Sequence, residues 1–598
     1  MALPIEDYAF VGDLHTGALV GRDGSIDWLC LPRFDSPSVF GALLGDSGHG
    51  RWLLAPVDPA ATSRRRYVGD SFVLETTWET PDGVVEVVDA MPVGDRRADV
   101  VRSIRGVAGS VLVRQELVLR FGYGRYLPWV QRVVDSGDGE GLLATAGPDS
   151  VLLRGGPLPQ AADHRHAGTV EVRAGDRLDY VLTWYPSHRP VPPRLDPQAR
   201  LRETVDRWQE WADRRERGGP YEAHVTRSLL VLRALTHEDT GGIVAAATTS
   251  LPEERGGRRN WDYRYSWLRD AALTIEALLS HGYHDEVCEW RDWLLRAIAG
   301  SPEQVQIMYG VDGARELEER ELPWLPGYEG SAPVRVGNGA YGQYQGDVLG
   351  EVMVALDRAR REGLGESEFS WPLQRELLRF VCEHGEDPDH GIWEIRGPLR
   401  HFTHSQVMVW AALDRGVQAV REHGLDGDAD AWAALRDKVR DRIESEGFDR
   451  SRGTYTQYFG GTTVDASLLQ LPQVGYCAPD DERMLGTVAA IELDLMSGGL
   501  LLRYRTETGV DGLPPGEHPF IACSFWLVEQ YARSGRLDDA RALMDRLVGL
   551  ANDVGLLSEE YAPDLGRQLG NVPQALSHLA LVRAADALDA AHRRRMQR

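Results

Sequence analysis

The chain has 598 residues, of which 42% are hydrophobic and 26% charged, and its formal net charge at pH 7 is −25. Because single hydrophobic cores stop growing beyond about 250–300 residues, we expect at least two domains. The negative charge argues against nucleic acid or an anionic membrane surface as a partner and suits a neutral ligand. No stretch approaches the roughly 20 apolar residues of a membrane-spanning helix.

The first residues and the cysteines indicate the compartment. The start, MALPIEDYAFVGDL, lacks the basic flank and apolar run of a secretory signal, so we expect a cytoplasmic protein. The five cysteines are far apart, odd in number, and form neither a CxxC pair nor a zinc pattern. We therefore expect buried, reduced thiols at Cys30, Cys288, Cys382, Cys477 and Cys523.

Residues 1–200 have the pattern of a β-domain. Segments such as SFVLETTWET, GVVEVVDAM and TVEVRAGDRLDYVLTWYP combine β-branched and aromatic residues with partial alternation, and turn signals such as PDG and SGDG separate them. This pattern is typical of a large antiparallel sandwich. A proline-rich stretch closes the region, and the charged segment before Gly218-Gly219-Pro220 predicts a linker helix within 201–220.

From 221 to 598 the hydrophobic period becomes helical, with apolar residues at i, i+3/4 and i+7. Twelve helices in one unit suggest six hairpins that close into a toroid. An open helical solenoid fits the same periodicity, but the sequence has no repeat of fixed length, which favours the toroid. The predicted helices are 221–238, 265–281, 285–299, 343–362, 371–384, 404–421, 428–445, 463–471, 481–493, 519–534, 537–550 and 573–592.

Three loops between these helices combine carboxylates with aromatic residues. They are RNWDYRYSWLRD at 259–270, HGIWEIRG at 390–397 and GLLSEEYAP at 555–563. Such a mixture suits a sugar pocket, because flat rings pack on a pyranose face and charged groups bind its hydroxyls. Taken alone, each loop is more simply explained as surface structure, either an aromatic latch with ion pairs or a solvated glutamate.

Glu394 lies between Trp393 and Ile395, and an apolar neighbourhood disfavours a charged carboxylate. Such a neighbourhood would raise the pKa of Glu394, as a proton donor near neutrality requires. Glycoside hydrolysis uses two carboxyl groups, of which one protonates the departing oxygen and the other attacks carbon or activates water. The residue pattern nominates this chemistry, but it does not choose the pair among 91 acidic residues.

The choice follows from a resemblance to glycoside hydrolase family 15, the glucoamylases, glucodextranases and prokaryotic trehalases. RNWDYRYSWLRDA resembles the family's first sugar-binding motif, GIWEIRG the loop of its general acid, LLSEEYAP the segment of its general base, and GGLLLRYRTE the loop of a sugar-binding arginine. The N-terminal EDYAFVGDLHTGALVGRDGSIDWLCLPRFDSPSVF resembles the β-domain of trehalase-like members. The resemblance spans nearly the whole chain and implies an N-terminal β-sandwich followed by an (α/α)6 barrel as the catalytic domain, 221–598.

By this resemblance Glu394 is the general acid and Glu559 the general base. Ile395 replaces a carboxylate that follows the acid in fungal members, so we expect recognition beyond the first sugar to differ. Glu560 stands where fungal members have glutamine, and the loop GNGAYGQYQGD at 337–347 is expected to line the pocket. The implied substrate-binding residues are Tyr263 near the catalytic water, Trp267 and Trp393 as aromatic walls, Arg269 and Asp270 on the hydroxyls of the first glucose, Arg503 as a second sugar-binding arginine, and Glu560.

The implied reaction is a single displacement with inversion, which releases β-glucose from the non-reducing end of an α-glucoside. Its two carboxyl groups should lie about 6.5–9.5 Å apart, rather than the roughly 5 Å of a retaining enzyme. Trehalose is the first choice of substrate, because the β-domain resembles trehalase-like members and the protein is expected in the cytoplasm. The alternative is an intracellular glucoamylase that acts on maltooligosaccharides or isomalto-linked glucans.

Two other classes of protein fit the sequence less well. An inverting disaccharide phosphorylase would replace the base by a phosphate site, and a non-catalytic sugar-binding protein would lack one carboxylate, so the presence of Glu394 and Glu559 argues against both. No metal or cofactor site is evident: the acidic run at 316–321 is expected to be a solvated helix face. A dependence on phosphate or Mg²⁺ and a homo-oligomer formed through the β-domain both stay open.

Overall fold

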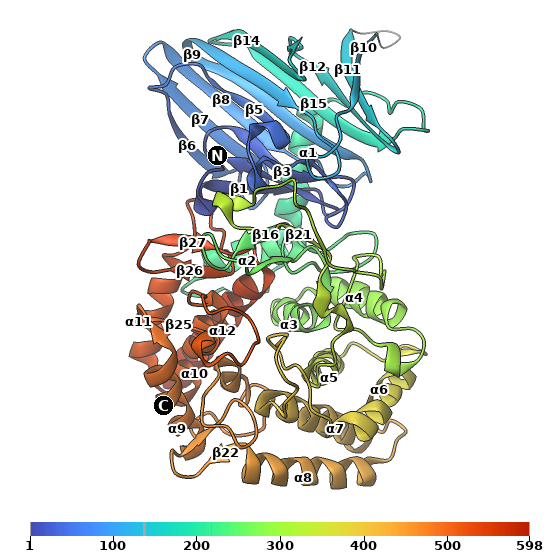
Figure 1. Ribbon diagram of the computed structural model, residues 1–598, viewed down its shortest axis with the longest axis vertical. Helices are drawn as coiled ribbons and strands as arrows, with labels where there is room; N and C mark the ends of the chain where they lie inside the picture. Colours follow the sequence, from blue (N-terminus) through green and yellow to red (C-terminus); the bar gives the residue numbers. More distant parts are fainter. Residues whose placement is uncertain (1, 135–138, 217, 597–598) are drawn as a thin grey trace.

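The computed structural model describes residues 2–134, 139–216 and 218–596. It has two parts, a large antiparallel sheet whose strands lie between Tyr8 and Pro186 and a set of helices formed by the rest of the chain (Figure 1). Helix α1 (Pro197–Asp213) lies between them, and the Asp196 side chain caps its first backbone N–H groups. The order of an antiparallel β-domain and a helical domain is the one that the sequence predicted.

One long strand, β9 (Ala98–Val118), holds the 15-stranded sheet together. The first half of β9 pairs with β8 (Gly83–Ala90) on one side and with β15 (Arg177–Pro186) on the other. Its second half pairs with β5 (Arg51–Pro56) and β14 (Arg165–Arg173), and all four pairings are antiparallel. The strand therefore belongs to both halves of the β-domain and fixes one against the other.

The strands form because their side chains alternate between core and solvent. In β9, Val111 and Val113 are buried, whereas Leu112 and Arg114 are exposed, as a strand with one face on a core requires. The other strands of this sheet are β1 (Tyr8–Gly12), β2 (Gly17–Gly21), β3 (Ser25–Cys30), β4 (Ser38–Phe40), β6 (Thr62–Tyr67), β7 (Leu74–Thr80), β10 (Trp129–Val134), β11 (Glu140–Ala146), β12 (Asp149–Gly155) and β13 (Gln160–Ala162).

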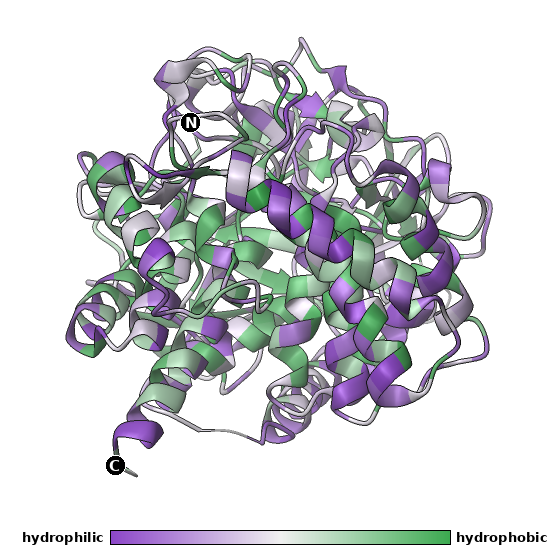
Figure 2. Ribbon diagram, turned by 90° about the horizontal axis from the view of Figure 1, so that it is seen from below, coloured by the Kyte–Doolittle hydropathy of each residue, from purple (hydrophilic) through white to green (hydrophobic). Residues whose placement is uncertain are grey.

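The helical part is a ring with an inner and an outer layer (Figure 1). Neighbouring elements of the inner layer contact one another in chain order, and the last, α12, contacts the first, α3, so the layer closes. Hydrophobic residues gather toward the middle of the ring and hydrophilic residues toward its outside (Figure 2). The inner elements are α3 (Leu268–Leu279), α5 (Asp347–Arg361), α7 (Thr403–His423), the 3-10 helix η7 (Ala466–Gln470), α10 (Ile521–Ser534) and α12 (Ala575–Met596).

The outer helices each pack against one or two inner elements. They are α2 (Glu222–Ala234), α4 (His284–Ala297), α6 (Ser370–His384), α8 (Ala429–Glu446), α9 (Glu482–Leu495) and α11 (Leu537–Val548). Short two-stranded pairs lie in the connecting loops: β16 (Thr249–Pro252) with β17 (Asn260–Asp262), β18 (Ser266–Trp267) with β19 (Met308–Tyr309), β20 (Arg320–Glu321) with β21 (Arg335–Val336), β22 (Phe448–Asp449) with β23 (Thr454–Tyr455), β24 (Met496–Ser497) with β25 (Leu500–Leu501), and β26 (Glu560–Ala562) with β27 (Arg567–Leu569).

Two predicted helical segments differ in the structure. The segment 463–471 forms only the 3-10 helix η7, and Pro472, which has no N–H group, directly follows Leu471 and cannot extend an α-helical hydrogen-bond ladder. The acidic run 316–321 is not a helix face but an irregular segment that ends in β20. Glu319 within it pairs with Arg335 and Arg396.

All five cysteines are free thiols, as predicted, but only Cys30 and Cys523 are buried, whereas Cys288 and Cys477 are half-buried and Cys382 is exposed. Cys382 lies in the last turn of the outer helix α6, whose buried residues include Leu377, Leu378 and Val381. Among residues 2–134, 139–216 and 218–596, no helix has the length and apolarity that crossing a bilayer requires.

Candidate active site

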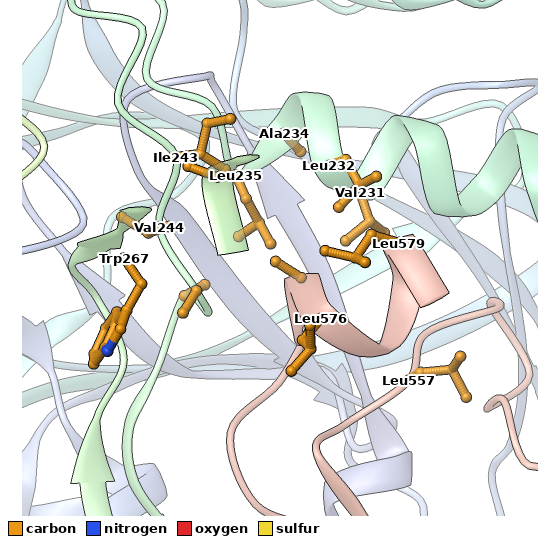
Figure 3. Close-up of a cluster of buried hydrophobic side chains, with 14 of the residues drawn as sticks. Val231, Leu232, Ala234, Leu235, Ile243, Val244, Trp267, Leu557, Leu576 and Leu579 are labelled. Carbon is orange, nitrogen blue, oxygen red and sulfur yellow. The ribbon is translucent and has the colours of Figure 1, made fainter. Parts of the chain in front are cut away.

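A pocket of about 680 Å³, measured with its open mouth, lies where the loops before the inner helices converge. Helices α3, α10 and α12 begin at residues that line it, so their positive dipole ends favour negative charge there. Next to this pocket, which Trp267 and Leu576 also line, a buried hydrophobic cluster joins α2 to the start of α12 (Figure 3). Of the residues predicted for the site, the pocket is lined by Tyr263, Trp267, Arg269, Asp270, Trp393, Glu394, Arg503 and Glu559.

Glu394 is partly enclosed, with a side chain that is 20% exposed. The indole N–H of Trp267 donates a 2.6 Å hydrogen bond to Oε1 of Glu394, and Nη1 of Arg269 lies 3.9 Å from the same oxygen. Burial raises the pKa of Glu394 above its ordinary value, while Arg269 and the Trp267 hydrogen bond act in the opposite direction. A carboxyl group in this setting can hold a proton and release it to a ligand oxygen.

The backbone of the Glu394 loop is held in a tight turn. Glu394 has a φ of +58°, a left-handed conformation that is uncommon for a residue other than glycine. The turn is closed by hydrogen bonds from the Glu394 N–H to the Gly391 carbonyl and from the Ile395 N–H to the His390 carbonyl. The Gln343 side-chain amide also donates to the carbonyls of Glu394 and Ile395, so the predicted 337–347 loop supports the acid loop.

Glu559 is more deeply buried, with 1% of the residue exposed. The Tyr263 hydroxyl donates a 2.6 Å hydrogen bond to Oε1 of Glu559, which leaves Oε2 as the oxygen that can accept from water. A Cβ on Gly570, whose φ is +75°, would come within 2.6 Å of both Cβ and Oε2 of Glu559, so the position needs glycine. Burial and the nearby charge of Glu253 raise the pKa of Glu559, while Arg503 opposes them.

Arg503 is the cation at the centre of a cluster of buried carboxyl groups. Its Nε pairs with Glu517 at 2.5 Å, and its Nη2 lies 3.1 Å from Glu253 and 3.7 Å from Glu560. Burial raises the pKa of Glu560 well above its ordinary value, and Glu253 and Glu517 raise it further. Arg503, together with Arg259, whose Nη1 lies 3.8 Å from Glu253, thus offsets negative charge beside the candidate base.

Glu560, although predicted as a substrate-binding residue, does not line the pocket. Its side chain is fully buried, and Oε2 accepts a hydrogen bond from the backbone N–H of His518. Because Glu560 begins strand β26, its side chain points away from that of the preceding Glu559, which faces the cavity. The structure therefore gives Glu560 a supporting position behind Arg503.

Arg269 and Trp393, two of the predicted sugar-binding residues, are each held in place by neighbouring groups. Nε of Arg269 pairs with Asp270 at 2.7 Å, and Nη1 of Arg269 donates to the Ile392 carbonyl. The Trp393 indole N–H donates to Asp465 at 2.8 Å, and the ring stacks near Trp526 with a centroid distance of 5.8 Å. These contacts fix a guanidinium and an aromatic ring in the pocket wall.

Other lining residues were not predicted as site residues. Glu253, in the TSLPEE segment, accepts a hydrogen bond from the Trp261 indole at 3.1 Å. Arg259 pairs with Asp511, which comes from a loop about 250 residues further along the chain. Arg259 and Trp261 lie in a loop that the sequence singled out, but nothing near Glu253 or Asp511 in sequence marks either of them.

The β-domain holds the loop that carries Tyr263 and Trp267. Arg264, between them, is fully buried and pairs with Asp262 at 2.6 Å. Its guanidinium also donates to the carbonyls of Phe34 and Ser36 and to the Tyr123 hydroxyl, all three in the β-domain. In this loop Tyr263 therefore reaches the pocket, while the next residue, Arg264, is anchored in the sheet domain.

In the described parts of the chain, no group of three or more His, Cys, Asp or Glu side chains is arranged to hold a metal ion. The pocket itself presents carboxyl groups, guanidinium groups and aromatic rings. Two glutamates on separate loops face one cavity, and each accepts a hydrogen bond from an aromatic side chain. Paired carboxyl groups beside aromatic walls at the end of a helical ring define a glycoside hydrolase site.

Comparison with known proteins agrees with this class. Residues 219–586 match the family described as glycosyl hydrolases family 15, and residues 1–154 match the one described as trehalase-like, N-terminal. The trehalase of Mycolicibacterium smegmatis is 37% identical over 612 residues, which cover 97% of this chain and 90% of that protein. The trehalase of Thermoplasma volcanium is 33% identical over 595 residues, which cover 98% and 94% respectively.

A solved bacterial glucoamylase in complex with acarbose has a similar fold, with a TM-score of 0.75 at 13% identity over 98% of this chain and 94% of that one. The chain belongs to glycosyl hydrolases family 15. It is an inverting glycoside hydrolase that acts on α-glucosides.

Proposed function

We propose that this enzyme is a trehalase, which hydrolyses trehalose by a single inverting displacement with Glu394 as general acid and Glu559 as general base. The observation that carries the proposal is that both carboxyl groups face one pocket from separate loops. The names of the full-length relatives, trehalases of two mycobacterial species and of two Thermoplasma species, support the choice of substrate.

The first half of the reaction belongs to Glu394. With its pKa raised by burial, Glu394 carries a proton and donates it to the oxygen that joins the two glucose units. The bond between that oxygen and C1 of the first glucose then breaks, and the second glucose leaves with the oxygen. The Trp267 hydrogen bond holds Glu394 in place before the transfer and stabilises the carboxylate after it.

The second half belongs to Glu559. Tyr263 holds Oε1, and Oε2 accepts a proton from water as the water oxygen bonds to C1 from the face opposite the leaving group. The first glucose is released as the β-anomer, and the second retains its α-configuration. Arg269 and Asp270 bind the hydroxyls of the first glucose, and Arg503 stabilises the ionised form of Glu559.

The experiment that tests this proposal compares substrates. The purified protein is incubated separately with trehalose, maltotriose and isomaltose, and released glucose is measured with and without inorganic phosphate. We expect the highest kcat/KM with trehalose and no glucose 1-phosphate. A preference for maltotriose or isomaltose would reassign the enzyme as a glucan α-glucosidase, and phosphate-dependent glucose 1-phosphate would make it a phosphorylase.

A further inference from the structure

The pocket wall beyond the general acid is formed by a cluster of charged and aromatic side chains, Trp261, Glu319, Arg335 and Arg396, called here the Arg396 cluster. Arg396 and Trp261 line the pocket. Nη2 of Arg396 pairs with Oε2 of Glu319 at 2.8 Å, and the guanidinium carbon lies 4.3 Å from the centroid of the Trp261 ring. Arg335 contacts the same ring at 4.6 Å and pairs with Glu319 at 3.5 Å.

The backbone brings Arg396 to the pocket because the intervening residue is turned away from it. Ile395 is 1% exposed and packs with Phe402, Tyr504 and Val510 in a small apolar cluster. The left-handed turn at Glu394 therefore places its carboxyl group in the pocket, sends Ile395 into the protein, and returns Arg396 to the pocket wall. The Arg396 N–H donates to the Asp511 carbonyl, which fixes this exit from the turn.

The position of Arg396 relative to Glu394 decides which sugar it can meet. Arg269, which is assigned to the first glucose, contacts the acid loop at the Ile392 carbonyl, before Glu394. Arg396 follows Glu394 and lies next to Trp261, and its side chain is 32% exposed. Because the Arg269 side chain is 11% exposed, Arg269 lies deeper in the pocket than Arg396, and the wall at Arg396 faces the sugar nearer the open mouth, which is the leaving sugar in an exo-acting enzyme.

The chemistry of the cluster suits a sugar rather than an apolar leaving group. A guanidinium carries five N–H donors in a planar fork, and the contact with Glu319 engages two of them, at 2.8 and 3.4 Å. The remaining N–H groups suit hydroxyl oxygens, and the indole of Trp261 supplies an adjacent apolar surface. Glu319 and the ring hold the side chain in one orientation before the ligand binds, which reduces the entropy lost on binding.

We propose that Arg396, held by Glu319 against Trp261, binds hydroxyls of the leaving sugar and makes the enzyme prefer glucosides whose leaving group is itself a sugar. This inference rests on the proposed function, because it takes Glu394 as the acid. Ile395 stands where fungal members have a carboxylate after the general acid, so we assign recognition of the leaving sugar to the next residue, Arg396.

The test compares a leaving group that is a sugar with one that is not. The variant Arg396→Met keeps the length and apolar stem of the side chain but removes its donors. We expect kcat/KM on trehalose to fall about tenfold or more, mainly through KM, because charge-assisted hydrogen bonds to the leaving glucose are lost. On 4-nitrophenyl α-glucoside, whose leaving group has no sugar hydroxyls, the same variant should lose less than about twofold.

Two further variants separate this role from a structural one. Glu319→Gln weakens the hold on Arg396 without removing it, so we expect a smaller loss with the same substrate dependence. Arg379→Met is the matched control, because Arg379 pairs with Glu376 and Glu383 on the exposed face of α6, and both substrates should be unaffected. Thermal unfolding of each variant shows that it is folded.

An equal loss by Arg396→Met on both substrates, or no loss on trehalose, would overturn the proposal. If the wild-type enzyme prefers maltose to trehalose, the proposed function fails, and the comparison is then made between maltose and the aryl glucoside. The test of Arg396 therefore depends on whether Arg396→Met loses more kcat/KM on a disaccharide than on the aryl glucoside. It does not depend on which disaccharide the enzyme prefers.

Discussion

Glu394 and Glu559 face the same pocket from very different surroundings. The Glu394 side chain is 20% exposed, has one indole donor at 2.6 Å, and its nearest guanidinium nitrogen lies 3.9 Å away. Glu559 is 1% exposed and lies near three other buried glutamates that share Arg503. Burial raises the pKa of both; the next largest influence is the negative charge of Glu253 at Glu559, which raises the pKa further, and the positive charge of Arg269 at Glu394, which lowers it.

The difference fits the two roles. A proton donor must give up its proton to a ligand oxygen, so an accessible carboxyl group with a modest opposing charge is suitable. A base must gain affinity for a proton as water attacks, and surrounding carboxylates increase that affinity, provided that a cation keeps the group ionised beforehand. The positive charge of Arg503, which lowers the pKa of Glu559, has this effect.

The largest expected effect comes from removing either carboxyl group. Glu394→Gln and Glu559→Gln should each lower kcat on trehalose by at least about 10²–10⁴-fold, because general acid and base catalysis each supply that much. Glu560→Gln is the matched control, since Glu560 is adjacent in sequence but outside the pocket, and its loss should be far smaller. Steady-state kinetics on purified variants measures this, and full activity of Glu559→Gln would refute its assignment.

A smaller effect is expected from the aromatic donors. Tyr263→Phe removes the hydrogen bond to Glu559 and keeps the ring, so kcat should fall about tenfold, in line with a hydrogen bond to a charged group. Trp267→Phe removes the donor to Glu394 and should lower kcat by a similar factor. The two variants should affect opposite limbs of the pH profile, and a change in the same limb for both would contradict the assignment of roles.

The smallest effect is a shift along the pH axis. Glu559 acts ionised, so kcat/KM should fall as pH falls through its raised pKa, and Glu394 acts protonated, so the rate should fall again at high pH. Glu253→Gln removes a neighbouring negative charge and should lower the pKa of Glu559, which moves the acid limb to lower pH. A limb that stays in place or moves to higher pH would show that Glu253 does not act on Glu559.

The sequence predicted most of the fold because its patterns are local. Alternation in β9 and the helical period of segments such as 428–445 depend on neighbouring residues alone. The segment 463–471 was mistaken for a full helix because its apolar spacing is helical, whereas Pro472 ends the turn. Likewise, Glu319 reads as part of a solvated acidic run, and only the fold brings Arg396 to it.

Local patterns and distant contacts also differ in weight between the surroundings of Glu394 and those of Glu559. The surroundings of Glu394 could be anticipated in part, because Trp393 is its sequence neighbour and Trp267 lies in a motif, although Ile395 is turned away from the pocket. The surroundings of Glu559 could not, because Glu253 and Glu517 are 306 and 42 residues away and come together only when the ring closes. Ionic neighbours that are distant in sequence leave no local pattern.

The anomeric form of the first glucose released from trehalose tests the central claim most directly. Proton NMR at early times, before mutarotation, distinguishes the α- and β-anomers. A single displacement by water activated at Glu559 predicts equal amounts of the two, β-glucose from the attacked unit and α-glucose from the leaving unit. Release of α-glucose alone would mean net retention and would contradict the paired roles of Glu394 and Glu559.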